Sequence, residues 1–136
     1  MIRYATKDDV EIINNFRTKF MIEQLKFDNP SLEIISDCLK LIDENNIILL
    51  YFEDNKSIGY LQGCKEKNKG LINQIFVEDN YRDNGIGEEL VKEFIKWCDN
   101  NSIKNIETNI ENGNDAFFLF DKLGFEIKKV SMNLNI

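Results

Sequence analysis

The 136-residue sequence predicts a single α/β domain in which a mixed, mostly antiparallel sheet is flanked by helices. Some segments place apolar residues at helical spacing, whereas others are short runs rich in branched and aromatic residues. Short polar turns join the central runs and favour antiparallel pairing, and a later strand–helix–strand passage favours a parallel crossover. The expected order is β-α-α-β-β-β-α-β-α-β. No linker divides the chain, so we expect residues 1–136 to form one domain.

The N-terminal part is predicted to contain a short strand and two helices. Residues 2–5 form the strand, and Thr6 and Asp9 have the spacing of a capping box at a helix start. The first helix has an apolar stripe at helical spacing, made of Val10, Ile13, Phe16 and Phe20. A second helix is expected over residues 30–44, because Pro30 suits a first helical position.

The remaining chain is predicted to begin with a three-stranded meander and to end with two helix–strand units. The meander turns are short enough for hairpins. Gly124 stands just past the last helix, where glycine is favoured. The expected strands are residues 47–53, 57–65, 71–77, 103–110 and 125–136, and the expected helices are residues 88–100 and about 112–123.

The charge balance argues against nucleic acid and membrane partners. Lys and Arg total 17 against 24 Asp and Glu, a net charge of −7, which disfavours binding to a phosphate backbone and favours cationic small molecules or basic peptides. The longest apolar run, residues 47–52, is far shorter than a membrane-spanning helix. The N-terminus has no apolar core of a secretory signal, so we expect a cytoplasmic protein.

The sequence contains no histidine, which excludes Ser-His-Asp triads, Cys-His dyads and histidine-based zinc sites. Three cysteines, Cys38, Cys64 and Cys98, are far apart and have no metal-ligand spacing, so we expect reduced thiols and no metal. Any acid–base chemistry must therefore use carboxylates, Tyr, Cys, Lys, the substrate or water.

Residues 75–90 read as a strand, a loop with paired glycines and a helix. Gly85 and Gly87 stand where free N–H groups and the helix dipole form an anion site, and Arg82 adds a permanent positive charge. A P-loop would need Lys where Glu88 follows the glycines, and a dinucleotide fingerprint would need a third glycine where Leu90 stands. Taken alone, the two glycines would fit equally well a flexible turn that leads into a helix and binds no anion.

The wider context resembles the GNAT (N-acetyltransferase) superfamily. The pattern Arg82-x-x-Gly85-x-Gly87, which follows Ile75-Phe76-Val77 and Tyr81, resembles the acetyl-CoA-binding motif of that superfamily. A second resemblance ends in the run Phe-Asp-Lys-Leu-Gly-Phe at residues 120–125. The element order also matches, so the resemblance covers essentially the whole chain and implies a GNAT-like sheet.

The resemblance implies specific roles for this segment. The diphosphate of CoA should lie on the N–H groups of the loop, and the strand before the loop should pair its backbone with the pantetheine arm. The sheet should splay after that strand, so that the thioester lies in the gap and an acceptor amine attacks it directly. The implied cofactor-binding residues are Ile75, Phe76, Val77, Arg82, Asp83, Asn84, Gly85, Ile86 and Gly87.

The sequence departs from the superfamily pattern at the expected acid and base. Phe120 stands where many relatives have a proton-donating tyrosine, and Asn73 and Gln74 stand where many have a carboxylate. The amides can still bind an acceptor or orient water. The other acid–base candidates are Tyr60, Glu107, Glu111 and Glu23. For each of them, the sequence favours a solvated surface group over a catalytic one.

We therefore expect an acetyl-CoA-dependent N-acetyltransferase that acts on a primary amine of a small molecule or peptide and that can associate as a homodimer. A catalytically weak or inactive CoA-binding regulatory module is the alternative, because Asn73, Gln74 and Phe120 do not titrate. A small-molecule sensor that never binds CoA is a further alternative, which Arg82, Gly85 and Gly87 disfavour.

Overall fold

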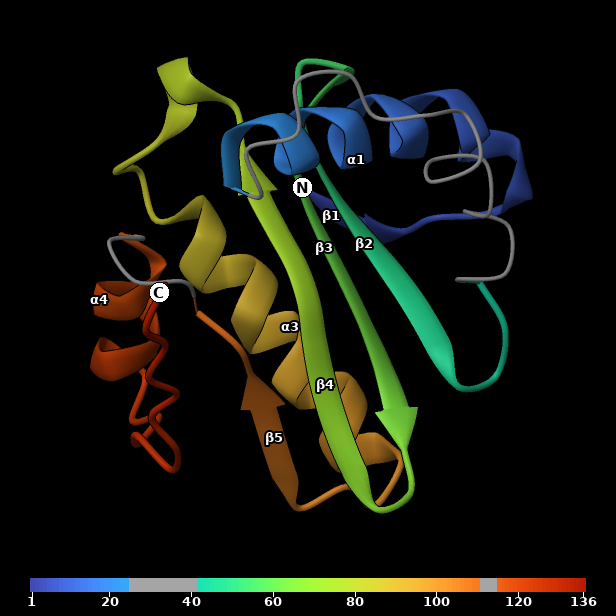
Figure 1. Ribbon diagram of the computed structural model, residues 1–136. Helices are drawn as coiled ribbons and strands as arrows, with labels where there is room; N and C mark the ends of the chain where they lie inside the picture. The colour runs from blue at the N-terminus through green and yellow to red at the C-terminus, as the bar shows by residue number, and fades with distance from the viewer. Residues whose placement is uncertain (25–41, 111–114) are drawn as a thin grey trace.

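The computed structural model describes residues 1–24, 42–110 and 115–136 of the chain (Figure 1). In these parts, five strands form one sheet in which each strand neighbours the next one along the chain. The strands are β1 (Ile2–Tyr4), β2 (Asn46–Glu53), β3 (Lys56–Glu66), β4 (Lys69–Val77) and β5 (Asn105–Thr108). The mixed, mostly antiparallel sheet predicted from the sequence is confirmed.

The meander of β2, β3 and β4 is antiparallel throughout, as the short turns predict. Asp54 and Asn55 both have positive φ, 51° and 67°, as a two-residue hairpin turn of the right twist requires. The pairing of β3 with β4 is interrupted by a bulge, because Gln62 opposes Gln74 whereas Gly63 opposes Ile72. Asn73 is the extra residue on β4.

The parallel crossover is also confirmed, because α3 (Ile86–Asn100) connects β4 to β5 and these two strands run parallel. Their pairing covers only Lys69–Ile72 of β4 against β5. The rest of β4, residues 73–77, has no strand partner on this side in the described parts of the chain. The sheet therefore opens between β4 and β5, as the resemblance implies.

Helices cover both faces of the sheet. One face packs against α1 (Val10–Gln24), whose Ile13 and Phe16 are fully buried. The other face packs against α3 and α4 (Ala116–Lys122), which contribute Leu90, Phe94 and Phe120 among other residues. The opening between β4 and β5 is therefore flanked by helices from three parts of the chain.

The predicted capping box is confirmed at the start of η1 (Lys7–Asp9), which leads into α1. The carboxylate of Asp9 accepts a hydrogen bond of 2.8 Å from the backbone N–H of Thr6. Arg3 of β1 donates two further hydrogen bonds of 2.8 Å to the same carboxylate. The hydrogen bonds from Arg3 lower the pKa of Asp9 to about 2.

The predicted strand over residues 125–136 is wrong, because this segment has no regular secondary structure. The backbone hydrogen bond from Phe125 N–H to Phe120 O belongs to the end of α4. Alternating apolar residues form a strand only when a neighbour pairs with them, and no strand of the described chain does so. Most of the predicted second helix lies outside the described residues, and residues 42–44 form bends rather than helix.

Candidate active site

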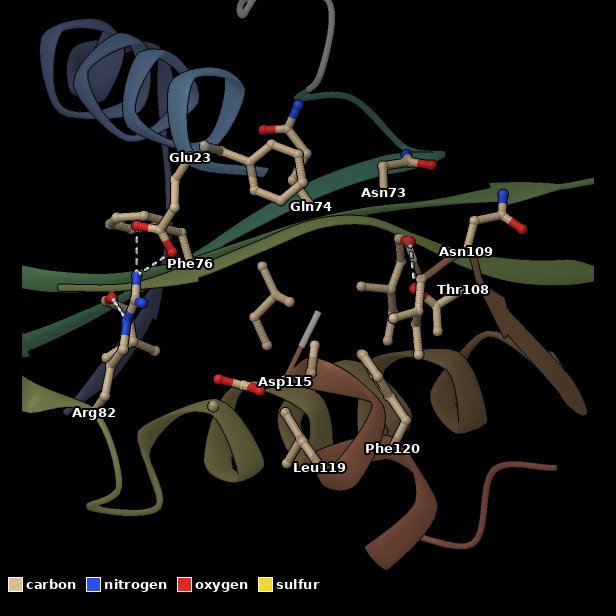
Figure 2. A pocket seen from close by; sticks show the side chains of 17 residues that line it. Glu23, Asn73, Gln74, Phe76, Arg82, Thr108, Asn109, Asp115, Leu119 and Phe120 are labelled. Carbon is tan, nitrogen blue, oxygen red and sulfur yellow. Dashed lines mark hydrogen bonds and ion pairs between the residues drawn. The ribbon is translucent and has the colours of Figure 1, made fainter. Parts of the chain in front are cut away.

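A cavity of about 350 Å³ occupies the opening of the sheet (Figure 2). β4 provides its longest wall, the chain beyond β5 and the start of α4 close it opposite, and α1 contributes from the other face of the sheet. The residues that line it are Phe20, Glu23, Ile72, Asn73, Gln74, Ile75, Phe76, Val77, Arg82, Gly87, Thr108, Asn109, Ile110, Asp115, Ala116, Leu119 and Phe120.

The glycine loop forms one end of this cavity. Gly85 has a φ of 81°, which favours glycine, and it is the N-cap of α3 without any side-chain cap. The first N–H groups of α3 have no partner within the helix, so they remain donors for an anion. A Cβ on Gly87 would lie 3.2 Å from Leu119 Cδ2, so this glycine also allows α4 to pack closely.

The acidic first turn of α3 does not oppose an anion as strongly as its sequence suggests. Glu88 forms ion pairs with Lys122 of α4 and Lys92 of α3, at 2.9 and 3.0 Å. The hydrogen bonds from these two lysines lower the pKa of Glu88. The pair with Lys122 also ties the helix that begins at the loop to the helix that closes the cavity.

Arg82 extends its side chain along the cavity wall rather than out of the loop (Figure 2). Its Nε donates a hydrogen bond of 2.7 Å to Val77 O, and its Nη2 lies 2.9 Å from the carboxylate of Glu23 on α1. Its guanidinium also lies 5.1 Å from the ring centre of Phe76. The hydrogen bond with Glu23 raises the pKa of Arg82. Arg82 thus ties α1 to β4 beside the loop.

Gln74 connects the cavity to a buried polar chain. The hydroxyl of Tyr60, which is fully buried, lies 2.8 Å from Gln74 Oε1 and 2.9 Å from Gln62 Oε1. A phenol has one proton to donate, so one of these carboxamides must present its NH₂ group to the tyrosine. The orientation of the Gln74 amide at the cavity is therefore coupled to residues inside the sheet.

The cavity does not include every predicted candidate. Glu107 forms an ion pair with Lys69 at the exposed side of β5 and does not line the cavity. Glu111 lies outside the described residues. Asn73 lines the cavity and donates a hydrogen bond of 3.5 Å to Cys64 Sγ. Phe120 both lines the cavity and is 2% exposed, and its ring centre lies 5.0 Å from that of Phe125.

Three polar residues of the cavity, Thr108, Asn109 and Asp115, have no counterpart among the sequence-based candidates. Thr108 donates a hydrogen bond of 3.1 Å from Oγ1 to Ile72 O, at the point where the two strands stop pairing. Asp115, the N-cap of α4, faces the cavity from the side opposite to α1 (Figure 2). No sequence motif identifies these residues, because their positions at the cavity depend on the divergence of β4 and β5.

Residues 11–125 match the family model of the acetyltransferase (GNAT) family. This chain is a member of that family. The protein is accordingly a GNAT N-acetyltransferase, and the cavity lies where β4 and β5 separate.

Solved structures of low sequence identity share the GNAT fold over the whole chain. Aminoglycoside acetyltransferase AAC(6')-Iy, in complex with a bisubstrate analogue derived from CoA, is 16% identical with a TM-score of 0.83, over 100% of this chain and 97% of that one. A second aminoglycoside acetyltransferase, AAC(6')-IG from Acinetobacter haemolyticus in its apo form, is 17% identical with a TM-score of 0.78, over 100% of this chain and 99% of that one. A transcriptional regulator from Bacillus halodurans is 18% identical with a TM-score of 0.81, over 100% and 99%. No curated protein matches significantly.

The described residues contain no cluster of three or more possible metal ligands. None of the helices in these parts of the chain is long and apolar enough to cross a membrane.

Proposed function

We propose that this GNAT enzyme moves the acetyl group of acetyl-CoA to a primary amine of a cationic small molecule or peptide, by direct attack within the cavity. One observation carries the proposal: the unpaired edge of β4 and the unpaired N–H groups at the start of α3 meet on the same cavity. An unpaired strand edge suits the amide groups of pantetheine, and a helix start suits a diphosphate.

The residues proposed to hold acetyl-CoA follow from these two features. The backbone of Ile75, Phe76 and Val77 offers the strand edge. The N–H groups of residues 83–87 offer the anion site, and the positive charge of Arg82 lies beside them. Acetyl-CoA supplies an activated acetyl thioester, and this chain orients it.

The chemistry requires that the acceptor amine lose a proton as its nitrogen bonds to the acetyl carbon and the C–S bond breaks. Asn73 and Gln74 do not titrate at the cavity, so we infer that they orient water that carries this proton away. Phe120 cannot protonate the departing thiolate, which is a tolerable leaving group without a side-chain acid.

The acceptor is proposed to be cationic because the described part of the lining holds two carboxylates, Glu23 and Asp115, and one cation, Arg82, which is paired with Glu23 (Figure 2). Two carboxylates at one cavity suit a molecule with more than one amino group, such as a polyamine or an aminoglycoside. The aminoglycoside acetyltransferases among the similar structures are consistent with this class.

A catalytically weak, CoA-binding regulatory role is the second candidate. It is favoured by the non-titrating side chains of Asn73, Gln74 and Phe120 at the positions expected for acid–base groups.

We further propose that the protein is cytoplasmic, because the thiols of Cys64 and Cys98 are free. We propose that it does not bind nucleic acid, because its net charge of −7 disfavours contact with a phosphate backbone. We also propose that the chain forms a homodimer without membrane association.

The decisive experiment measures thiol release from acetyl-CoA with a panel of polyamines, aminoglycosides and lysine-containing peptides, alongside calorimetry of acetyl-CoA binding. We expect binding, and thiol release that requires an amine. Binding without turnover on any amine would favour the regulatory module instead. Absence of both binding and turnover would contradict both functions.

A further inference from the structure

An ion pair inside the cavity joins the proposed cofactor site to the proposed acceptor site. Arg82 Nη2 lies 2.9 Å from the carboxylate of Glu23, and both residues belong to the cavity lining (Figure 2). Their side chains are 37% and 36% exposed, so a ligand that enters the cavity can reach either of them. Among the described residues of the lining, only Arg82 is cationic, so the pair neutralises this cation and a carboxylate together.

The two partners belong to different elements, and Arg82 has further contacts near the loop. Glu23 stands in the last turn of α1, and Figure 2 shows it reaching Arg82 from that helix. Arg82 Nε donates a hydrogen bond of 2.7 Å to Val77 O, and its Nη1 lies 3.1 Å from Asp79. These two contacts do not involve α1. Arg82 therefore keeps an anchor at the loop when its contact with Glu23 is broken.

Each of the two proposed ligands competes for one member of this pair. A diphosphate at the start of α3 attracts the guanidinium of Arg82, and an ammonium group of a cationic acceptor attracts the carboxylate of Glu23. Either ligand alone must break the ion pair, whereas the two ligands together break it only once. Each should therefore bind more tightly when the other is present, and thermodynamic linkage makes the effect equal in both directions.

We propose that Glu23 is a specificity-determining residue that exchanges Arg82 for an ammonium group of the acceptor when acetyl-CoA binds. This rests on the proposed function, which assigns the diphosphate to the loop and a cationic acceptor to the cavity. The ammonium on Glu23 is not the amine that reacts, so the exchange favours acceptors with at least two amino groups. An acceptor with a single amino group has no second ammonium for Glu23.

Direct attraction between anionic CoA and a cationic amine also makes the two ligands bind cooperatively. That attraction requires neither Glu23 nor Arg82. The exchange adds a part of the coupling that disappears when either residue is neutralised, and that falls no further when both are neutralised. This part should amount to about two- to fivefold in affinity, the range of a partly exposed ion pair.

Calorimetry on the full chain separates the two contributions. The cofactor is CoA without its acetyl group, so that no transfer occurs, and the probe amines are spermidine and kanamycin, one from each proposed acceptor class. Each amine is titrated without CoA and with CoA at a concentration shown to saturate that variant. The ratio of the two amine affinities is the coupling factor.

The variants for this titration are Glu23→Gln, Arg82→Gln and the double substitution. Glu11→Gln is the matched control, because it removes the same charge near the other end of α1. For at least one probe amine, the coupling factor of the native protein and of the control should exceed that of Glu23→Gln and of Arg82→Gln by about two- to fivefold. The double variant should match the two single variants.

Turnover with acetyl-CoA gives an independent readout of specificity. The ratio of kcat/KM for the better probe amine to that for butylamine, which has one amino group, should fall in Glu23→Gln by about two- to fivefold. The same ratio should be unchanged in Glu11→Gln. A loss of stability alone would lower both values of kcat/KM and leave their ratio unaltered.

The possible failures can be told apart. Equal coupling factors in the native protein and in Glu23→Gln would overturn the exchange and leave the proposed function intact. A coupling factor that falls in Glu23→Gln but not in Arg82→Gln would also overturn it, because the carboxylate would then act on the amine without exchanging Arg82. Failure of CoA to bind any variant or the native protein would contradict the proposed function itself. Failure of both amines to bind the CoA-loaded native protein would overturn the exchange and the cationic acceptor.

Discussion

The backbone of Gly85 has a φ of 81°, in the left-handed region, and a Cβ at this position would meet no atom within 4 Å. A substitution is therefore opposed by backbone strain and not by packing within the protein. In the proposed site, the added Cβ would also face the diphosphate. Gly124 has a similar φ of 93° and equally open surroundings at the end of α4.

These two glycines form a matched pair for the first prediction. Gly85→Ala and Gly124→Ala should each lower the free energy of unfolding by about 1–2 kcal/mol, the cost of left-handed backbone for a non-glycine residue. Only Gly85→Ala should also weaken acetyl-CoA binding. Denaturant titration and calorimetry measure the two effects, and equal affinities in both variants would place the diphosphate elsewhere.

A substitution at Phe120 tests whether a proton donor at this position would increase turnover. Phe120→Tyr places a hydroxyl on a residue that lines the cavity, so turnover with a good amine should rise, by at most about 10²-fold. Phe117→Tyr, on the same helix but outside the cavity lining, serves as the control. Lower stability of Phe120→Tyr by about 1–3 kcal/mol with unchanged turnover would assign Phe120 to the core alone.

At the scale of the element, the start of α1 depends on a single carboxylate. Asp9 accepts hydrogen bonds from Thr6 N and from Arg3, so it joins the helix cap to β1. Its folded pKa of about 2 lies below the ordinary value of 3.8. The ion pair therefore stabilises the fold above the unfolded pKa, and this contribution is lost as pH falls from about 4 to about 2.

Asp9→Asn should therefore be less stable than the native protein by about 1–2 kcal/mol at pH 7. The difference should shrink as pH is lowered towards 2, because the native carboxylate becomes protonated there. Urea titrations across this pH range measure it, with Asp8→Asn, at the exposed neighbouring position, as the control. A difference that stays constant with pH would mean that packing, not charge, explains the loss.

The contact between α1 and the glycine loop predicts competition for Arg82. Glu23 already engages Arg82 Nη2, so a diphosphate that uses this guanidinium must compete with the carboxylate. Glu23→Gln should tighten acetyl-CoA binding about two- to fivefold, the range of an exposed ion pair. Glu11→Gln, which removes the same charge elsewhere on α1, should have no effect.

The competition is isolated by repeating the measurement in an Arg82→Gln background. There, Glu23→Gln should no longer change the affinity for acetyl-CoA, because the shared partner is absent. If the substitution tightens binding equally in both backgrounds, Glu23 acts through general repulsion of the phosphates rather than through Arg82.

At the scale of the whole molecule, acetyl-CoA should stabilise the fold because its proposed site joins β4, α3 and α4. Saturation at about 100 times the dissociation constant should add about 2.7 kcal/mol to the free energy of unfolding. Thermal melts at increasing acetyl-CoA concentration measure the shift, with free adenine as a ligand that lacks the diphosphate. No shift at millimolar acetyl-CoA would argue against the proposed site.

The sequence by itself determined the features that depend on local physics. The capping box at Thr6, the hairpin turn at Asp54 and Asn55, the amphipathic α3 and the loop at Gly85 all follow from residues within one or two turns of each other. Such patterns can be recognised in a sequence because periodicity and backbone preference act over short separations. The resemblance to the family could be recognised for the same reason, since the residues of its motifs lie in short runs.

Only the tertiary structure decided which polar groups meet. Arg82 and Glu23 are 59 residues apart in the chain, and Tyr60 and Gln74 are brought together by strand register. Glu107 pairs with Lys69 instead of entering the cavity. The strand predicted over residues 125–136 does not form in the protomer. In each case the outcome depends on which partner packing brings within reach, and a local pattern does not contain that information.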